Sequence, residues 1–209
     1  MGDESVNTAI KRAERAGTDK FALRRRGLAE AALEAIAERG FARTGLREIA
    51  QRSDLSHGSL HYYFTDKNDL IAEAVRISKG RPAERYAAIV ASATTPDELA
   101  VGVAEEMTRS LRDDAALHRL WYDLRNQALF ESGFGDTIEQ VEAMLQEAIW
   151  GVLERYAELA GKPCRFDALL AYSLTDGMLQ NALIRHLRGD ADAIDRLRRE
   201  CLALFAACV

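Results

Sequence analysis

Apolar residues spaced three and four apart recur along this chain, which is the period of an α-helix with one buried face. Leu28, Ala32, Leu33 and Ile36 form the first such stripe. Sustained alternation of apolar and polar residues, which marks a half-buried strand, is nearly absent. We therefore expect an all-α protein of about nine helices, with four short helices at the amino-terminal end.

Residues that are common at helix ends indicate where the individual helices begin and end. Thr44, Ser56 and Asp66 can cap the second, third and fourth helices. The clearest start is Thr95-Pro96-Asp97-Glu98, with a Thr cap, Pro at the first helical position and Glu at the third. Gly80 and Pro82 either kink the fourth helix or split it.

Composition excludes several classes of protein. The 209 residues are 48% hydrophobic and carry a net charge of -5, and the chain has no apolar run of the roughly 20 residues that a membrane helix needs. Three widely spaced cysteines do not make a disulfide framework or a zinc cluster. We expect a reduced, cytoplasmic protein without a metal or cofactor.

Charge is distributed unevenly along the chain. Residues 1–80 hold 14 basic and 12 acidic side chains, whereas the remainder holds 14 basic and 21 acidic ones. A head that is slightly basic can approach phosphate while an acidic body keeps the protein in solution.

Residues 45–64, GLREIAQRSDLSHGSLHYYF, are the one segment that suggests a specific chemistry. They read as a short amphipathic helix, a tight turn and a second short helix. Leu60 and Phe64 can fix the second helix to the core, because a helix this short is not stable alone. Hydrogen-bonding side chains fill its other positions, and a helix of this kind suits the major groove of DNA. They are His57, Ser59, His61, Tyr62 and Tyr63.

The stretch from about Lys20 to Ala74 resembles the DNA-binding domain of the TetR family of bacterial transcriptional regulators. The resemblance rests on the Ala-rich first helix with Gly40-Phe41 after it, Thr44, Ile49-Ala50, Ser56-His57-Gly58-Ser59-Leu60, Tyr62-Tyr63-Phe64, Lys67 and Leu70. It implies a homodimer, a DNA-binding head, and an inducer-binding body built on the last helices. Asp54 departs from the Gly common in the family, and His61 stands where a Tyr or another large residue is frequent.

The expected DNA contacts are Thr44, His57, Ser59, His61, Tyr62, Tyr63 and Lys67. Lys67 begins the fourth helix, where backbone N–H groups already favour a phosphate. His57 and His61 have a spacing that could hold zinc, but no third ligand is apparent nearby. Arg24, Arg25 and Arg26 are phosphate contacts or a solvated helix face, and the sequence leaves both open.

The helix near 114–131 carries a mixed stripe of polar and aromatic groups beside a core stripe, which suits either the lining of a ligand pocket or a half-exposed helix face. The expected apolar lining is Trp121, Tyr122, Met144, Trp150 and Tyr172, and the expected polar anchors are Arg125, Asn126 and Asp176. A buried Arg125 needs an anion. We favour Asp176 over the ligand as its source, which makes a neutral inducer the expectation.

The helix near 166–188 is apolar or small on almost every side, so it needs cover on every side. We expect that it and the last helix form a dimer interface. The residues expected there are Leu179, Leu183, Ile184, Leu197, Cys201 and Phe205. The expected organisation is a tail over 1–17, a helix-turn-helix DNA-binding domain over 18–66, and a ligand-binding and dimerisation domain over 67–209.

These features predict a ligand-responsive transcriptional regulator and not an enzyme. We expect a repressor that binds a palindromic operator as a homodimer and is released by a small-molecule inducer. A DNA-binding regulator without a small-molecule ligand is one alternative. A small all-helical enzyme is another, although the sequence has no GxSxG, HExxH or phosphate-loop glycine pattern.

Overall fold

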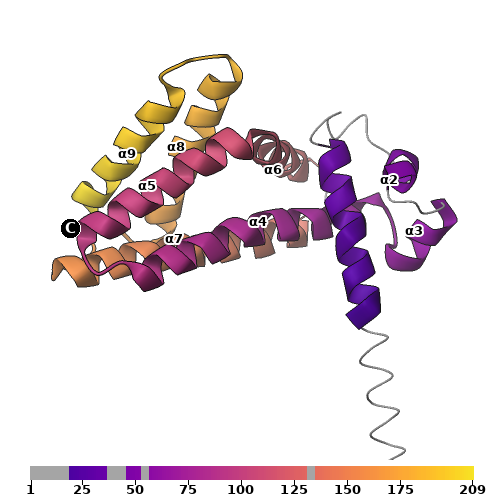
Figure 1. Ribbon diagram of the computed structural model, residues 1–209, viewed down its shortest axis with the longest axis horizontal. Coiled ribbons are helices and arrows are strands. Elements are labelled where there is room, and N and C mark those ends of the chain that lie inside the picture. Colours follow the sequence, from indigo (N-terminus) through magenta and orange to yellow (C-terminus); the bar gives the residue numbers. More distant parts are fainter. Residues whose placement is uncertain (1–18, 37–45, 53–56, 131–134) are drawn as a thin grey trace, which may run out of the picture. The chain divides into compact units, whose positions relative to one another are not determined.

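The computed structural model describes residues 19–36, 46–52, 57–130 and 135–209 (Figure 1). The regular elements in these ranges are all α-helices, which confirms the expected fold class. An amino-terminal helix over 19–36 precedes α2 (Leu46–Arg52), α3 (His57–Tyr63), α4 (Lys67–Ser92), α5 (Pro96–Asp113), α6 (Ala115–Ala128), α7 (Gly135–Ala160), α8 (Ala168–Leu187) and α9 (Ala193–Cys208). The expected caps Thr44 and Ser56 lie outside the described residues.

The chain forms two compact units, residues 1–77 and 78–209. The boundary falls inside α4, so the first turns of that helix belong to the amino-terminal unit. The division expected after residue 66 is one between a DNA-binding domain and a ligand-binding and dimerisation domain, and it stays a prediction.

The core of the amino-terminal unit is built from the stripes that the sequence predicts. Leu28, Leu33 and Ile36 of the first helix are almost completely buried, as are Ile49 of α2 and Leu60 of α3. α2 and α3 pack against each other. Because each has only seven residues, this tertiary packing and not intrinsic propensity holds them in helical form.

Two of the expected caps are present in the structure. The carboxylate of Asp66 accepts a hydrogen bond from the backbone N–H of Asp69 at 2.9 Å, at the start of α4. The hydroxyl of Thr95 accepts one from Glu98 at 3.2 Å, while the Glu98 carboxylate accepts one from the N–H of Thr94 at 2.9 Å. These bonds satisfy N–H groups that the first turn of a helix leaves unpaired.

In the carboxyl-terminal unit, α5 packs along α9, and α8 packs against both α7 and α9. Figure 1 shows α8 and α9 as neighbours joined by a short turn, where Gly189 has a φ of 82°. Gly161 ends α7 with a φ of 65°; both values lie in the left-handed region that glycine adopts readily. α4 continues as one helix through Gly80 and Pro82, so the helix is not split.

A buried carboxylate joins α4 to α5 within this unit. Glu106 of α5 is 8% exposed and pairs with Arg85 of α4 and with Arg109, one turn further along α5, the latter at 2.7 Å. Burial alone would raise the pKa of Glu106, but the hydrogen bonds from the two guanidinium groups outweigh it and lower the pKa. Glu106 is therefore an anion at neutral pH. Its Oε1 joins α4 to α5 through Arg85, while its Oε2 accepts from Arg109 within α5.

Candidate functional site

α3 has one buried and one exposed face. Leu60 and the following Phe64 are buried, whereas His61 and Tyr62 are exposed and Tyr63 is half-buried. An apolar back that fixes the helix, with polar and aromatic groups facing outward, is the arrangement expected of a recognition helix. Of the other expected DNA contacts, Thr44 and the side chains of His57 and Ser59 lie outside the described part of the chain.

An aromatic cluster fixes the end of α3 to the first helix. The ring of Phe21 lies 5.7 Å from that of Tyr62 and 5.1 Å from that of Tyr63, and the two tyrosine rings are 5.0 Å apart. Tyr62 nevertheless remains 73% exposed. Ring contacts of this kind restrict the rotamers of both tyrosines, so the exposed groups are held in place before any partner binds.

Arg25 contributes to the fold of the amino-terminal unit. Its guanidinium donates to the backbone carbonyl of Tyr63 at 2.8 Å, pairs with Asp69 of α4 at 2.5 Å, and lies over the ring of Phe64 at 4.4 Å. These contacts connect the first helix with the end of α3 and the start of α4. Arg24 is exposed, so phosphate contact stays open for that residue.

Lys67 occupies the first position of α4 and is half-buried. Burial lowers the pKa of its ammonium, and the nearby carboxylate of Glu48 in α2 partly opposes that effect. Its location at a helix N-terminus suits a phosphate contact. That role stays a prediction.

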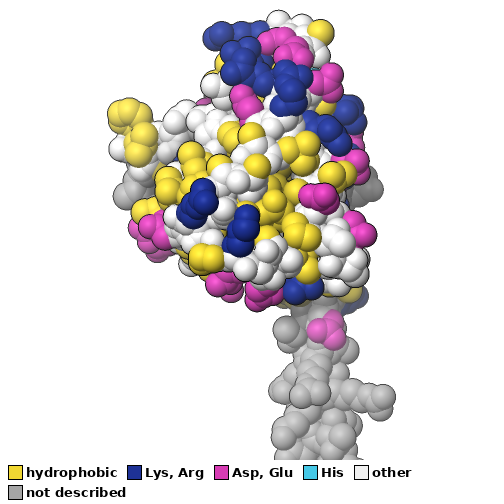
Figure 2. Space-filling model, turned by 90° about the vertical axis from the view of Figure 1, so that its left-hand side faces the viewer, with side chains coloured by type: hydrophobic (Ala, Val, Ile, Leu, Met, Phe, Trp, Pro, Cys, Tyr) yellow, Lys and Arg dark blue, Asp and Glu magenta, His cyan; other side chains and the backbone are white. Residues whose placement is uncertain are grey.

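Basic side chains also gather at the turn between α8 and α9, and several of them are paired with carboxylates. Figure 2 shows this region with acidic and basic side chains close together. Arg185 pairs with Asp190 at 3.2 Å, and Arg199 pairs with Asp192 at 2.9 Å. A surface whose charges already balance has little attraction for phosphate.

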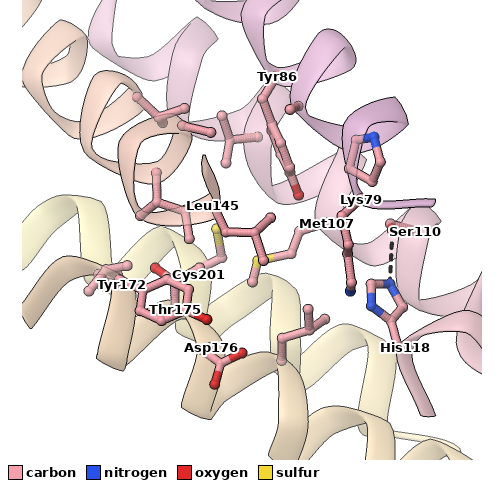
Figure 3. A pocket seen from close by; sticks show the side chains of 18 of the residues that line it. Lys79, Tyr86, Met107, Ser110, His118, Leu145, Tyr172, Thr175, Asp176 and Cys201 are labelled. Atoms are coloured by element: carbon pink, nitrogen blue, oxygen red, sulfur yellow. Dashed lines mark hydrogen bonds between the residues drawn. The ribbon is translucent and has the colours of Figure 1, made fainter. Parts of the chain in front are cut away.

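The carboxyl-terminal unit contains a largely apolar cavity of about 100 Å³ (Figure 3). Side chains from all six helices α4 to α9 line it. Of the expected ligand contacts, Trp121, Tyr122, Tyr172 and Asp176 lie on its wall. The apolar part of the wall includes Val103, Met107, Leu145, Ile149, Val152, Leu153, Leu204 and Phe205.

The other expected ligand contacts lie elsewhere. Arg125 and Asn126 border a neighbouring hollow of about 440 Å³, which shares Tyr122 and Asp176 with the cavity. Trp150 borders a third hollow, of about 460 Å³, beside the loop that follows α7. Met144 is not among the described residues that line the cavity. The mixed stripe on α6 thus divides between two adjacent spaces.

Asp176 supplies the anion that Arg125 needs. The guanidinium pairs with one oxygen of Asp176 at 2.6 Å and with Glu142 of α7 at 2.9 Å. The hydroxyl of Tyr122 donates to the other oxygen of Asp176 at 3.0 Å. Burial and the Asp176 carboxylate together raise the pKa of Tyr122, so its hydroxyl keeps its proton. Both oxygens of Asp176 are therefore occupied from within the protein.

The dimer residues expected from the sequence are mostly internal. Leu183, Leu197, Cys201 and Phe205 are between 0% and 3% exposed within one chain. Leu179, Cys201 and Phe205 line the cavity. Ile184 differs, because it is 45% exposed. It lies on α8 with other exposed apolar side chains, which are Leu169, Leu170, Leu174 and Leu187.

Sequence reasoning missed the most polar end of the cavity, which Lys79, His118 and Ser110 form. The Lys79 side chain is 6% exposed, and no hydrogen bond or ion pair reaches its ammonium from any described residue. Its nitrogen lies 5.3 Å from the centre of the Trp121 ring. The signal was its position, since Val75, Lys79, Pro82 and Tyr86 follow the helical spacing of a buried stripe on α4.

His118 lies beside Lys79 in Figure 3, and the two side chains point into the same end of the cavity. Its Nε2 shares a hydrogen bond of 2.9 Å with the hydroxyl of Ser110. Burial lowers the pKa of His118 to about 3, and the Lys79 cation adds to that effect. Burial also lowers the pKa of Lys79 to about 8, against a partial opposing effect of Asp176. At neutral pH the imidazole is neutral and the ammonium is mostly charged.

Two other site types find no support in the described ranges. They contain no group of three or more His, Cys, Asp or Glu side chains that could hold a metal ion. None of their helices is both long and apolar enough to cross a membrane.

Residues 28–74 match the family described as "Bacterial regulatory proteins, tetR family". The matched range includes α2, α3 and the first turns of α4. It therefore coincides with the unit that presents His61 and Tyr62 on its surface. No curated protein matches the sequence.

Several solved structures share the fold. A TetR transcription regulator from Haloarcula marismortui has a TM-score of 0.73 at 19% identity, covering 90% of this chain and 98% of its own. FadR from Bacillus subtilis, solved with stearoyl-CoA, has a TM-score of 0.67 at 18% identity, with coverages of 88% and 98%. A protein from Saccharomonospora viridis, solved with choline, has a TM-score of 0.69 at 20% identity, with coverages of 87% and 95%. Residues 28–74 therefore match the tetR-family model, and the chain as a whole has the same fold as solved transcriptional regulators that include TetR-type proteins.

Proposed function

We propose that this protein is a ligand-responsive transcriptional repressor that binds a palindromic operator as a homodimer. The observation that carries the proposal is the tetR-family match over residues 28–74, which falls on the helices that present His61 and Tyr62 outward. A protein acting on DNA in this way works in the cytoplasm and needs no catalytic group.

In this proposal α3 enters the major groove, and its exposed side chains read base edges. Base contacts of this type typically contribute about 1–3 kcal/mol of discrimination each. Lys67 at the start of α4 contacts phosphate, which fixes the position of the head without reading sequence. Arg25 acts indirectly, because it keeps the first helix, α3 and α4 in register.

Homodimerisation through α8 is supported by the exposed apolar face of that helix. Leu170, Leu174, Ile184 and Leu187 are each between 38% and 50% exposed. Exposed apolar side chains that share one helix face mark an interface more often than a free surface. The burial of Leu183 and Leu197 within one chain moves the proposed interface from the core side of α8 and α9 to this outer face. Two heads held about 34–36 Å apart would then meet successive major grooves.

Regulation by a small molecule is supported by the cavity between α4 and α9. Stearoyl-CoA and choline in the two related structures are chemically unlike each other, so the fold supports ligand binding without identifying the ligand. A ligand shifts the equilibrium only if it binds the conformation with low DNA affinity more tightly than the other one.

The test is selection of bound sequences from a pool of random duplexes, using the full chain without any added ligand. We expect an enriched palindrome with half-sites one helical turn apart. His61→Ala should change which bases are preferred, whereas Lys67→Ala should weaken all selected sequences by a similar factor and reduce the salt dependence. Selection that enriches no sequence would refute the proposed function.

A further inference from the structure

One end of the cavity gathers polar groups that nothing in the described protein satisfies. The indole N–H of Trp121, the Nδ1 of His118 and the hydroxyl of Tyr172 are buried and have no hydrogen-bond partner among the described residues. The Lys79 ammonium lies against the Trp121 ring, and no described residue forms a hydrogen bond or ion pair with it. Nδ1 of His118 is a donor when the Ser110 hydroxyl donates to Nε2, and an acceptor when Nε2 carries the proton and donates to Ser110. Lys79, Trp121 and His118 all line the same cavity, and Figure 3 shows Lys79 beside His118.

The carboxylate on the cavity wall, that of Asp176, is already paired with other side chains. Asp176 accepts from Arg125 with one oxygen and from Tyr122 with the other. A buried ammonium without a direct partner is costly, and so is a buried N–H group without an acceptor. A positive charge and unpaired polar groups therefore lie in the wall at this end of the cavity, beside the space that a ligand would enter.

We propose that the cavity binds a monoanionic amphiphile, a small apolar carboxylate whose oxygens pair with Lys79 and accept a hydrogen bond from Trp121. The apolar body would occupy the space lined by Met107 of α5 and Leu145 of α7. This inference rests on the proposed function and identifies its ligand class. It replaces the neutral inducer expected from sequence, because the pairing of Arg125 with Asp176 leaves Lys79 as the group without a partner.

Charge excludes the two other ligand classes that the wall could suggest. The rings of Tyr86, Trp121 and Tyr172 would suit a quaternary ammonium group, but the Lys79 cation repels it. A phosphate monoester carries between one and two negative charges near neutral pH, and one buried ammonium leaves part of that charge unpaired. A carboxylate balances the charge of Lys79 one to one.

The size of the cavity limits the body of the ligand. An engineered apolar cavity of about 150 Å³ in another protein accommodates benzene, and the cavity described here is about 100 Å³. This cavity is smaller than that one, so a single ring is the largest apolar body to test, and its entry requires the cavity wall to move outward. Benzoate combines such a ring with one carboxylate.

The experiment is calorimetric titration of the full chain with four probes of similar size, which are benzoate, benzyl alcohol, benzylamine and phenyl phosphate. We expect benzoate to bind at least tenfold more tightly than the other three. In Lys79→Met, which keeps the apolar stem, benzoate should lose at least tenfold in affinity while benzyl alcohol loses none. Lys162→Met is the matched control, since Lys162 is exposed and does not line the cavity, and it should bind benzoate as the native chain does.

A second variant keeps the inference testable if Lys79→Met does not fold. Trp121→Phe removes the indole N–H but keeps a ring, so it should weaken benzoate three- to tenfold and leave benzyl alcohol unchanged. Equal affinity for benzoate and benzyl alcohol, tighter binding of benzylamine or phenyl phosphate, or no binding of benzoate would each overturn the carboxylate assignment. The titration contains no DNA and the duplex selection contains no ligand, so failure of this inference is distinguishable from failure of the proposed function.

Discussion

At the scale of single residues, Lys79 has the strongest effect on how the protein responds to its surroundings. Its side chain is buried, and the described residues offer its ammonium no direct hydrogen bond or ion pair. The unfolded chain would hydrate the same ammonium fully. Lys79 therefore lowers the stability of the folded state whenever it is charged.

This produces a stability change with pH that can be measured. The pKa of Lys79 falls from 10.5 to about 8 on folding, so between pH 8 and pH 10 the folded state has released a proton that the unfolded state still holds. Unfolding then takes up a proton, and stability rises with pH by at most about 1.4 kcal/mol per unit. The buried thiols Cys201 and Cys208 act in the opposite direction, since burial raises their pKa values to about 12 and about 11.

The measurement is urea unfolding of the native chain and of Lys79→Met at several pH values over this window. The difference between the two isolates Lys79, because the thiols are common to both. We expect the native chain to gain stability relative to Lys79→Met as the pH rises from 8 to 10. A constant difference would mean that Lys79 titrates normally in the folded state.

The sequence indicated the ion pair between Arg125 and Asp176 in the carboxyl-terminal unit, but it did not indicate that Lys79 is buried. Arg125 and Asp176 stood out because they interrupt apolar stripes on two helices, and the structure pairs them at 2.6 Å. Lys79 precedes Gly80 and Pro82, and the sequence does not decide whether these two residues kink the helix or split it. Without a certain helix its position on the buried stripe could not be assigned, and burial depends on packing from five other helices.

At the scale of elements, Gly80 offers a direct test of α4. A Cβ added at this position meets no atom within 4 Å. Gly80→Ala should therefore stabilise the protein by about 0.5–1 kcal/mol, because alanine loses less backbone entropy than glycine in a helix. Gly151→Ala in α7 also adds its Cβ to open space, and it should give a similar gain in urea unfolding.

Gly102→Ala in α5 is the contrasting variant. Its Cβ would lie 3.0 Å from a methyl carbon of Ile89 in α4, so the side chain of Ile89 must shift and the gain should be lost. A gain at Gly151 without one at Gly80 would show that α4 departs from regular helix near Pro82.

The outer face of α8 makes a second prediction at this scale. If the proposed dimer forms through this face, Ile184→Arg or Leu174→Arg should convert it to monomer, because the interface would bury an unpaired charge. Leu129→Arg is the control, since Leu129 is 78% exposed just after α6 and lies off this face. Sedimentation velocity gives the oligomeric state. A dimer that survives charges at both positions would place the interface on another surface.

Local signals predicted the helices and their ends better than they predicted their partners. The caps at Asp66 and Thr95 depend on a few adjacent residues, and both form as expected. To predict the dimer residues of α8 and α9, one must know which side of each helix packs against the rest of its own chain. A helix that is apolar all round does not encode that choice, so Leu183 could not be told from Ile184.

At the scale of the whole molecule, the proposed function requires operator binding and ligand binding to be linked by one coupling free energy. If benzoate at saturation weakens operator binding by a given factor, saturating operator must weaken benzoate binding by the same factor. A tenfold effect corresponds to about 1.4 kcal/mol. Fluorescence anisotropy with labelled operator gives the first factor, and calorimetry in the presence of operator gives the second.

We expect equal factors greater than one for the native chain, and factors near one for Lys79→Met because that variant no longer retains the carboxylate. Benzoate binding that leaves operator affinity unchanged would separate the cavity from control of DNA binding. Unequal factors would indicate that the two ligands do not act on the same two states.

Pro82 has a further consequence, which concerns how the two parts of α4 exchange their amide hydrogens with solvent. Proline has no N–H, so the backbone carbonyl of Ser78 does not receive the helical hydrogen bond that residue 82 would otherwise donate. Ser78 is the first residue of the carboxyl-terminal unit, so the break lies at the boundary between the two units. Amide hydrogens before and after this break can therefore exchange with solvent in separate opening events. In hydrogen–deuterium exchange, benzoate should slow the amides of residues 84–92 and leave those of residues 70–77 at their original rates.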